Sequence, residues 1–223
     1  MKEIADLQLL KKDILLSADE YIRSNRLRPL FLFGDITKSP FIRSVWKNAI
    51  GFGFSVSCWS KPTAVPDGAA AVADFEHFNY APTDLVLVRS QDVDRSYFTG
   101  MSACAEAVYC LLSKATDLRD QHIVVIGRGH AVNGLAAGLL SNNAAVSVVH
   151  SQVHQGYVQE LCKKADIVIN SAPQLPYFIE CPGLLLDIGH VESHSVGIYF
   201  NDIGQLTTAY LLKRCVKDEG VSE

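Results

Sequence analysis

Two glycines separated by one residue, Gly127 and Gly129, form the most informative pattern in the sequence. A glycine turn lets the backbone approach the diphosphate of a nucleotide closely, and unpaired N–H groups at the start of a following helix attract its negative charge. Arg128 adds a positive side chain between the two glycines. The pattern is incomplete, because Val132 stands where the third glycine of G-x-G-x-x-G belongs. A strand–turn–helix unit without a ligand is the alternative interpretation.

The neighbouring segments supply the context that such a turn requires. Residues 123–126 are a β-branched run typical of a buried parallel strand, residues 131–140 predict a helix, and residues 144–149 predict the next strand. About twenty residues beyond the glycines, a NAD site has Asp or Glu for the ribose hydroxyls. The chain has His-Ser-Gln at 150–152 instead. With no carboxylate there and Arg128 in the turn, we expect NADP rather than NAD.

The composition is that of a globular protein. The 223 residues are 48% hydrophobic and 20% charged, and the formal net charge is −4. The lack of a basic cluster argues against nucleic acid as a partner. No apolar run is long enough to cross a bilayer, and charges among the apolar N-terminal residues indicate an amphipathic helix rather than a signal peptide. Six scattered cysteines without a CxxC pair are typical of reduced thiols, so we expect a soluble cytoplasmic protein.

Two histidine pairs have the i,i+4 spacing that metal ligands can use, His150/His154 and His190/His194. Neither pair has the glutamate of an HExxH motif, and both fall near the ends of predicted strands rather than in clear helices. We therefore expect no metal site.

Alternating helical and extended segments predict an α/β fold with parallel sheets. Helical spacing or capping residues indicate helices over residues 3–24, 39–50, 69–78, 101–114, 131–140, 158–164 and 204–217. Short apolar runs indicate strands over residues 30–33, 54–59, 84–88, 123–126, 144–149, 166–170 and 184–187.

Several of these segments, taken in order, resemble the bifunctional methylenetetrahydrofolate dehydrogenase/methenyltetrahydrofolate cyclohydrolase family. The glycine turn lies in VVIGRGHAVNGLAAGLL, which is similar to that family's VVIGRS-x-x-VG-x-P-x-x-x-LL. The other matching segments are FGDITKSPFIRSVWK, QDVDRSYF, VVHSQV, ADIVINSAP, LLLDIGH and IGQLTTAYLL. Together they cover the chain from about residue 30 to residue 215 and follow the family's order, which chance reproduces less readily than any one motif.

The resemblance implies two α/β domains flanking a cleft, the second with a Rossmann-type parallel sheet. Residues 1–112, joined by the C-terminal helix 204–217, would form the folate domain, and residues 113–203 the dinucleotide-binding domain. The implied chemistry is hydride transfer from a folate one-carbon unit to NADP and then hydrolysis of the methenyl product. The family also implies a homodimer. The chain is shorter than the family's usual length, which makes it a shortened and diverged member.

On the cofactor side, the resemblance matches Arg128 and Ser151 to the positions that hold the 2′-phosphate. Pro173 replaces a turn glycine and therefore removes an N–H. The residues expected to contact the cofactor are Gly127, Arg128, Gly129, His150, Ser151, Ala172, Pro173, Gly204 and Thr207. Gly204 and Thr207 have a simple alternative role, as the entry of a helix with a hydroxyl cap.

On the substrate side, the match to the family is weaker. Asp94 aligns with the aspartate that holds the pterin ring, although a turn residue is an equal alternative, and Arg89 aligns with a glutamine. With one gap, the family's tyrosine and lysine align with Phe41 and Val45. Val45 would then line the cleft, and Lys47 would face away because two helical residues turn through about 200°.

Two hypotheses remain open. One is an NADP-dependent oxidoreductase acting on a folate-like substrate with the cyclohydrolase step impaired, because valine cannot move a proton. The other is a non-catalytic paralogue that binds a nucleotide or pterin, or that pairs with another subunit.

Overall fold

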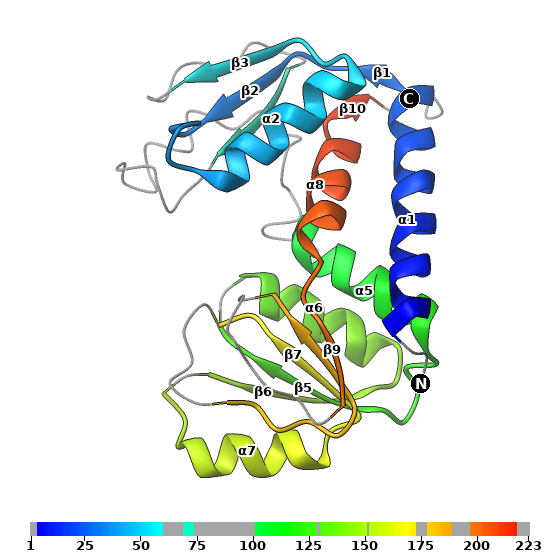
Figure 1. Ribbon diagram of the computed structural model, residues 1–223, viewed down its shortest axis with the longest axis vertical. Coiled ribbons are helices and arrows are strands. Elements are labelled where there is room, and N and C mark those ends of the chain that lie inside the picture. Colours follow the sequence, from blue (N-terminus) through cyan, green and yellow to red (C-terminus); the bar gives the residue numbers. More distant parts are fainter. Residues whose placement is uncertain are drawn as a thin grey trace. The chain divides into compact units, whose positions relative to one another are not determined.

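The computed structural model describes residues 4–59, 69–73, 101–128, 130–150, 152–172, 178–188 and 197–217. The chain divides into two compact units, shown in Figure 1. Unit 1 comprises Met1–Ile14 and Gly100–Thr207, and unit 2 comprises Leu15–Thr99 and Thr208–Glu223. The helix α5 (Ala103–Ala115) packs on α6 (His130–Ser141) and belongs to unit 1.

Unit 1 is built on a parallel sheet. Its strands, in the order β6-β5-β7-β8-β9, are β6 (Ala145–Val149), β5 (His122–Ile126), β7 (Ile167–Asn170), β8 (Leu184–Asp187) and β9 (Ile198–Phe200). Every residue of β7 and β8 is buried, as expected for central strands covered on both faces. The parallel sheet that the sequence predicted is therefore present, and β9 is a strand that it did not anticipate.

Helices cover both faces of this sheet. In Figure 1, α7 (Gln155–Lys164) lies on one face, and α5 and α6 lie on the other. Val158 and Cys162 of α7 share a hydrophobic cluster with Val124 and Val168 of the strands. Because side chains alternate along a strand, the neighbours of Val124 in β5 point to the opposite face, toward α6. The two faces thus have separate apolar layers.

Two helices contribute residues to both units. The helix α1 (Ile4–Ser24) begins in unit 1 and ends in unit 2, and so does α8 (Gly204–Lys213). Lys11, in the part of α1 that belongs to unit 1, is 5% exposed and forms an ion pair with Asp202, just before α8. Among the helices that the structure describes, none is both long enough and apolar enough to cross a membrane.

Unit 2 contains a smaller parallel sheet with the strand order β3-β2-β4. The strands are β2 (Leu30–Phe33), β3 (Val56–Trp59) and β4 (Ala70–Ala73), and α2 (Pro40–Phe52) packs on them. The helix starts as the sequence predicts, because the Oγ of Ser39 accepts a hydrogen bond from the N–H of Ile42 at 3.0 Å. It ends at Gly53, whose φ of 89° is left-handed.

Two expectations about unit 2 were wrong. Residues 69–78 were predicted to be helical, but residues 70–73 form β4, paired in parallel with β2. A short alanine run has high helix propensity, yet its small side chains also fit a buried strand, and pairing along β2 decides the outcome. The closing helix stops at Lys213 rather than at residue 217, because β10 (Val216–Lys217) pairs antiparallel with β1 (Arg26–Leu27).

Candidate functional site

The carboxyl ends of the parallel strands of unit 1 define the edge where a ligand is expected. The chain passes from β5 to β6 on one side and then returns to place β7 on the other side of β5. In open parallel sheets, ligands bind beyond the carboxyl ends of the strands at such a reversal of strand order. The loops after β5 and β7 are therefore the walls of the candidate site.

The loop after β5 begins with Gly127, where the backbone requires glycine. Its φ is 142°, and a Cβ built there would lie 2.8 Å from the Oγ of Ser171 and 3.3 Å from Cγ2 of Val132. Its N–H donates to the carbonyl oxygen of Val149 at 2.7 Å, which fixes the turn to β6. The absence of a side chain lets Ser171 and Val132 pack closely against the turn. Val132 is buried, so it packs the turn instead of lining it.

The turn leads into α6 within three residues. The side chain of Arg128 is exposed, and α6 begins at His130. The first N–H groups of a helix have no partners within the helix and favour an anion. An exposed guanidinium next to a helix start and a bare glycine is suited to hold phosphate. Gly129 and the side chain of His130 lie outside the described part of the chain.

The loop after β7 is anchored to β5 and to β8. The N–H of Ser171 donates to the carbonyl oxygen of Ile126 at 2.8 Å, and the N–H of the buried Ala172 donates to Oδ1 of Asn170 at 3.1 Å. Nδ2 of Asn170 donates to Oδ1 of Asp187 at 2.9 Å. The hydroxyl of Tyr199 donates to Oδ2 of Asp187, also at 2.9 Å. The loop is therefore rigidly tied to three neighbouring strands.

The sequence reasoning missed this Asn170–Asp187–Tyr199 network. Asn170 and Asp187 are both 0% exposed, and each is the last residue of a strand that is otherwise apolar. Buried polar side chains need partners, so a polar residue that ends a wholly apolar strand is a signal that could have been used. Such a polar residue identifies the edge of the sheet, but it does not predict which side chains meet there.

The histidines near β6 are used in turns. Nδ1 of His150 accepts a hydrogen bond from the N–H of Gln152, and Nδ1 of His154 accepts one from the N–H of Gly156, both at 3.2 Å. His154 is thereby the N-cap of α7. In each of these two histidines, Nδ1 is thus bonded to the local backbone. Ser151, Pro173 and the pair His190/His194 lie outside the described ranges.

Gly204 and Thr207 lie at the start of α8, after the carboxyl end of β9. Since neighbouring strands are about 4.8 Å apart, β9 is about 14 Å from β5, so only an extended ligand could reach both. The Oγ1 of Thr207 donates to the carbonyl oxygen of Ile203 at 3.2 Å and is hydrogen-bonded to Cys104. Burial raises the pKa of the Cys104 thiol, and the bond to Thr207 opposes that shift.

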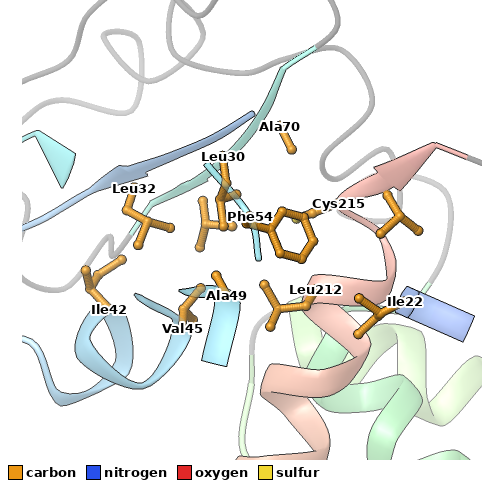
Figure 2. Packing of buried hydrophobic residues seen from close by; sticks show 12 residues of the cluster. Ile22, Leu30, Leu32, Ile42, Val45, Ala49, Phe54, Ala70, Leu212 and Cys215 are labelled. Carbon is orange, nitrogen blue, oxygen red and sulfur yellow. The ribbon is translucent and has the colours of Figure 1, made fainter. Parts of the chain in front are cut away.

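The residues aligned with the family's catalytic pair lie in unit 2. Val45 is 0% exposed and belongs to the apolar cluster between α2 and β2, together with Leu30, Ile42 and Phe54 (Figure 2). The expectation that Val45 lines a cleft is therefore wrong, because α2 turns this side to its own sheet. Lys47 is exposed, as expected. The side chain of Phe41, and Arg89 and Asp94, lie outside the described part of the chain.

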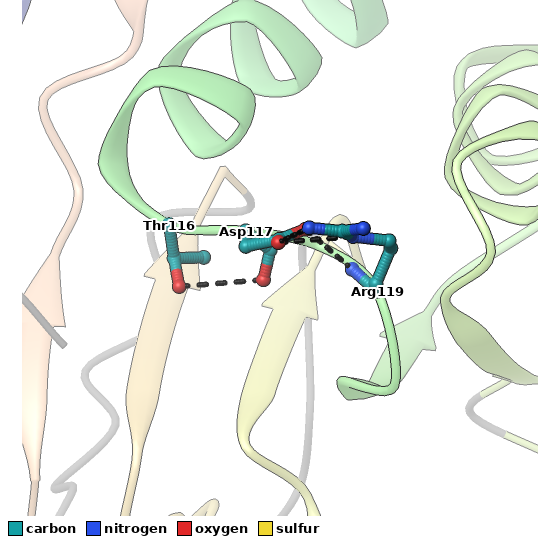
Figure 3. Close-up of polar contacts among 3 residues, drawn as sticks. All are labelled: Thr116, Asp117 and Arg119. Carbon is teal, nitrogen blue, oxygen red and sulfur yellow. Dashed lines mark hydrogen bonds and ion pairs between the residues drawn. The ribbon is translucent and has the colours of Figure 1, made fainter.

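A hollow of about 550 Å³ lies at the opposite edge of the sheet in unit 1, between the end of α5 with the loop that follows it and the end of α6. Asp117 in its wall accepts hydrogen bonds from Nε of Arg119 at 3.1 and 3.0 Å (Figure 3). These bonds lower the pKa of Asp117 to about 2. None of the residues predicted for the site lines this hollow, so it is separate from the glycine turn.

Residues 102–184 match the family described as tetrahydrofolate dehydrogenase/cyclohydrolase, NAD(P)-binding domain. The bifunctional protein FolD of Petrotoga mobilis (strain DSM 10674 / SJ95) is 28% identical over 111 residues, which are 46% of this chain and 40% of that protein. The chain therefore aligns with less than half of the length of this relative.

Solved structures extend the likeness of the fold over nearly the whole chain. The methylenetetrahydrofolate dehydrogenase-cyclohydrolase of Trypanosoma brucei, complexed with NADP and an inhibitor, has a TM-score of 0.70 at 17% identity, covering 96% of this chain and 95% of that one. The enzyme of Campylobacter jejuni also has a TM-score of 0.70 at 17% identity, with coverages of 95% and 94%. Residues 102–184 are therefore similar to the NAD(P)-binding domain of the tetrahydrofolate dehydrogenase/cyclohydrolase family, the resemblance that the motifs predicted.

Proposed function

We propose that this protein binds NADP at the glycine turn of unit 1 and transfers a hydride between it and a folate-like one-carbon carrier. The observation that carries the proposal is the tight Gly127 turn at the reversal of strand order, just before α6, in a segment that matches an NAD(P)-binding domain. When bound, the nicotinamide supplies the hydride acceptor, and this chain supplies position and charge.

The residues present fit a dinucleotide. Gly127 makes the tight turn that leads into α6, and the first N–H groups of α6 favour the charge of a diphosphate. The exposed Arg128 would hold the 2′-phosphate, and the sequence 150–152 after β6 contains no carboxylate to repel it. Among the other predicted contacts, Ser151 would assist Arg128, whereas Gly204 lies at the distant end of an extended ligand.

In this proposal, the methenyl product is not hydrolysed by the family's lysine-dependent mechanism, because the aligned residue is Val45. Val45 has no group that transfers a proton, and it is buried in the core of unit 2. We propose that the cyclohydrolase step is impaired and that Asp94 and Arg89 orient the substrate. We also propose that the protein is a cytoplasmic homodimer. The family resemblance supports the homodimer, and six free cysteines support the cytoplasm.

A second candidate function, a non-catalytic paralogue, is favoured by the same burial of Val45. A chain that keeps the nucleotide-binding edge but not the catalytic lysine could bind NADP without turnover, alone or with a partner subunit.

The test is a titration with NADPH and NADH, followed by an assay of NADP reduction with methylenetetrahydrofolate. We expect NADPH to bind more tightly, and Arg128→Gln to weaken NADPH binding about tenfold to hundredfold while changing NADH binding little, because a charge-assisted bond contributes about 1.5–3 kcal/mol. Arg119→Gln, at the opposite edge, is the matched control. Binding with reduction supports the enzyme, and binding without reduction supports the paralogue. Failure to bind either nucleotide would refute both.

A further inference from the structure

We infer that Ser171 is a further contact for the dinucleotide, and that the Asn170–Asp187–Tyr199 network positions it. This inference rests on the proposed NADP site and adds to it a hydroxyl that would donate to an oxygen of the diphosphate. The residues predicted from sequence for this loop were its neighbours Ala172 and Pro173.

The first argument is the position of the Ser171 side chain. Its Oγ lies 2.8 Å from where a Cβ of Gly127 would be, so the hydroxyl is held against the turn that leads into α6. Ser171 follows β7 and Gly127 follows β5, and these two neighbouring strands flank the reversal of strand order. A diphosphate lying over the turn would therefore meet this hydroxyl.

The second argument is that the Ser171 hydroxyl remains available. The side chain is half-buried, and its Oγ has no hydrogen bond to the residues that the structure describes. Its backbone N–H is already bonded to the carbonyl oxygen of Ile126. A partly buried hydroxyl gains when a ligand oxygen completes its hydrogen bonding, because burial reduces its contact with water.

The third argument is the fixed backbone on both sides of Ser171. Before it, the carbonyl oxygen of Asn170 accepts from the N–H of Ile188 at 2.7 Å. After it, the N–H of Ala172 donates to Oδ1 of Asn170, whose amide is oriented by Asp187. Tyr199 holds the other carboxylate oxygen of Asp187. Ser171 thus has little freedom beyond rotation about χ1, and a preorganised donor loses little entropy on binding.

The experiment compares two ligands in variants of the full chain. Ser171→Ala should weaken NADPH binding about tenfold, since a hydrogen bond to a charged oxygen is lost. It should leave the affinity for adenosine 2′-monophosphate unchanged, because that compound has the 2′-phosphate and no part of the diphosphate. Arg128→Gln should weaken the binding of both ligands. The control Ser141→Ala removes an exposed hydroxyl bonded to the carbonyl oxygen of Ala137 and should change neither affinity.

Tyr199→Phe, which removes the hydroxyl that donates to Asp187, tests the positioning role by a double-mutant cycle. It should weaken NADPH binding when Ser171 is present and have little effect when residue 171 is alanine. Equal weakening in both backgrounds would overturn the positioning role.

If the wild type binds NADPH and Ser171→Ala binds it equally well, the contact is overturned while the proposed function stands. If the wild type binds no NADPH, the contact and the proposed function both fail. Thermal melting of each variant without ligand separates lost contacts from unfolding.

Discussion

Replacing Val45 by lysine would restore the family's residue at the aligned position, and the structure gives a definite expectation for the result. Val45 has no exposed surface and lies among Leu30, Ile42 and Phe54 in the core of unit 2. A lysine there could not extend to solvent without disrupting α2 or β2. We therefore expect Val45→Lys to destabilise unit 2 instead of creating an active site, whether or not Phe41→Tyr is present.

The magnitude follows from the charge and the volume. Holding a buried lysine neutral costs about 1.36 kcal/mol for each pH unit below its ordinary pKa, hence about 4–5 kcal/mol at pH 7. Forcing a longer side chain into the same space adds about 1–3 kcal/mol. The sum, about 5–8 kcal/mol, is comparable with the whole free energy of unfolding of a typical domain, about 5–15 kcal/mol.

The assay is urea unfolding of Val45→Lys and of Val45→Met, which has a similar length without the charge. The difference in unfolding free energy between them should be about 4–5 kcal/mol at pH 7 and should shrink as the pH rises toward 10. Asn48→Lys, on the exposed side of α2, should change stability by no more than about 0.5 kcal/mol. A stable Val45→Lys with no such pH dependence would refute the reasoning, because it would mean that the side chain reaches water.

Two further predictions concern ionisation. Asp117 should titrate at about 2 by carbon NMR, and Arg119→Gln should return its pKa toward 3.8. Because folding lowers the pKa of Asp117, its contribution to stability is complete above about pH 4 and is lost as the pH falls through 2. If the titration midpoint of Asp117 were the same in Arg119→Gln, Arg119 would not be the cause of the lowered pKa. A thiol reagent at pH 8 should label the exposed Cys58 in the native protein and Cys162 only after unfolding, since burial raises the pKa of Cys162 to about 12. Rapid native labelling of Cys162, with Cys58→Ser as the control, would contradict its burial.

Much of the fold could be predicted from local patterns, because each parallel strand is a short apolar run bounded by turn residues. The strand before Gly127 and the Ser39 cap of α2 are of this kind. The alanines of β4 were misread, because their conformation depends on pairing with β2, more than thirty-five residues away in sequence. The strand β9, only Ile198–Phe200, is equally dependent on its neighbour β8.

The candidate site was predictable only where its chemistry is local. Gly127 and Arg128 are adjacent in sequence, so the turn and its charge could be recognised together. Asn170, Asp187 and Tyr199 come from three strands, and only the order of those strands brings them together. For Val45, an alignment gives the position in the sequence but not the direction in which the side chain points. That direction depends on which side of α2 faces the sheet.

The carboxylate of Asp187 has a consequence for the chemistry that this edge can support. Both of its oxygens accept hydrogen bonds, from Asn170 and from Tyr199, so this carboxylate links the ends of three neighbouring strands. Its role at this edge is structural. Oxidising a methylene bridge between two nitrogens removes a hydride and leaves a delocalised cation, and no proton needs to leave. The proposed hydride transfer therefore needs nothing from Asp187 beyond its structural role.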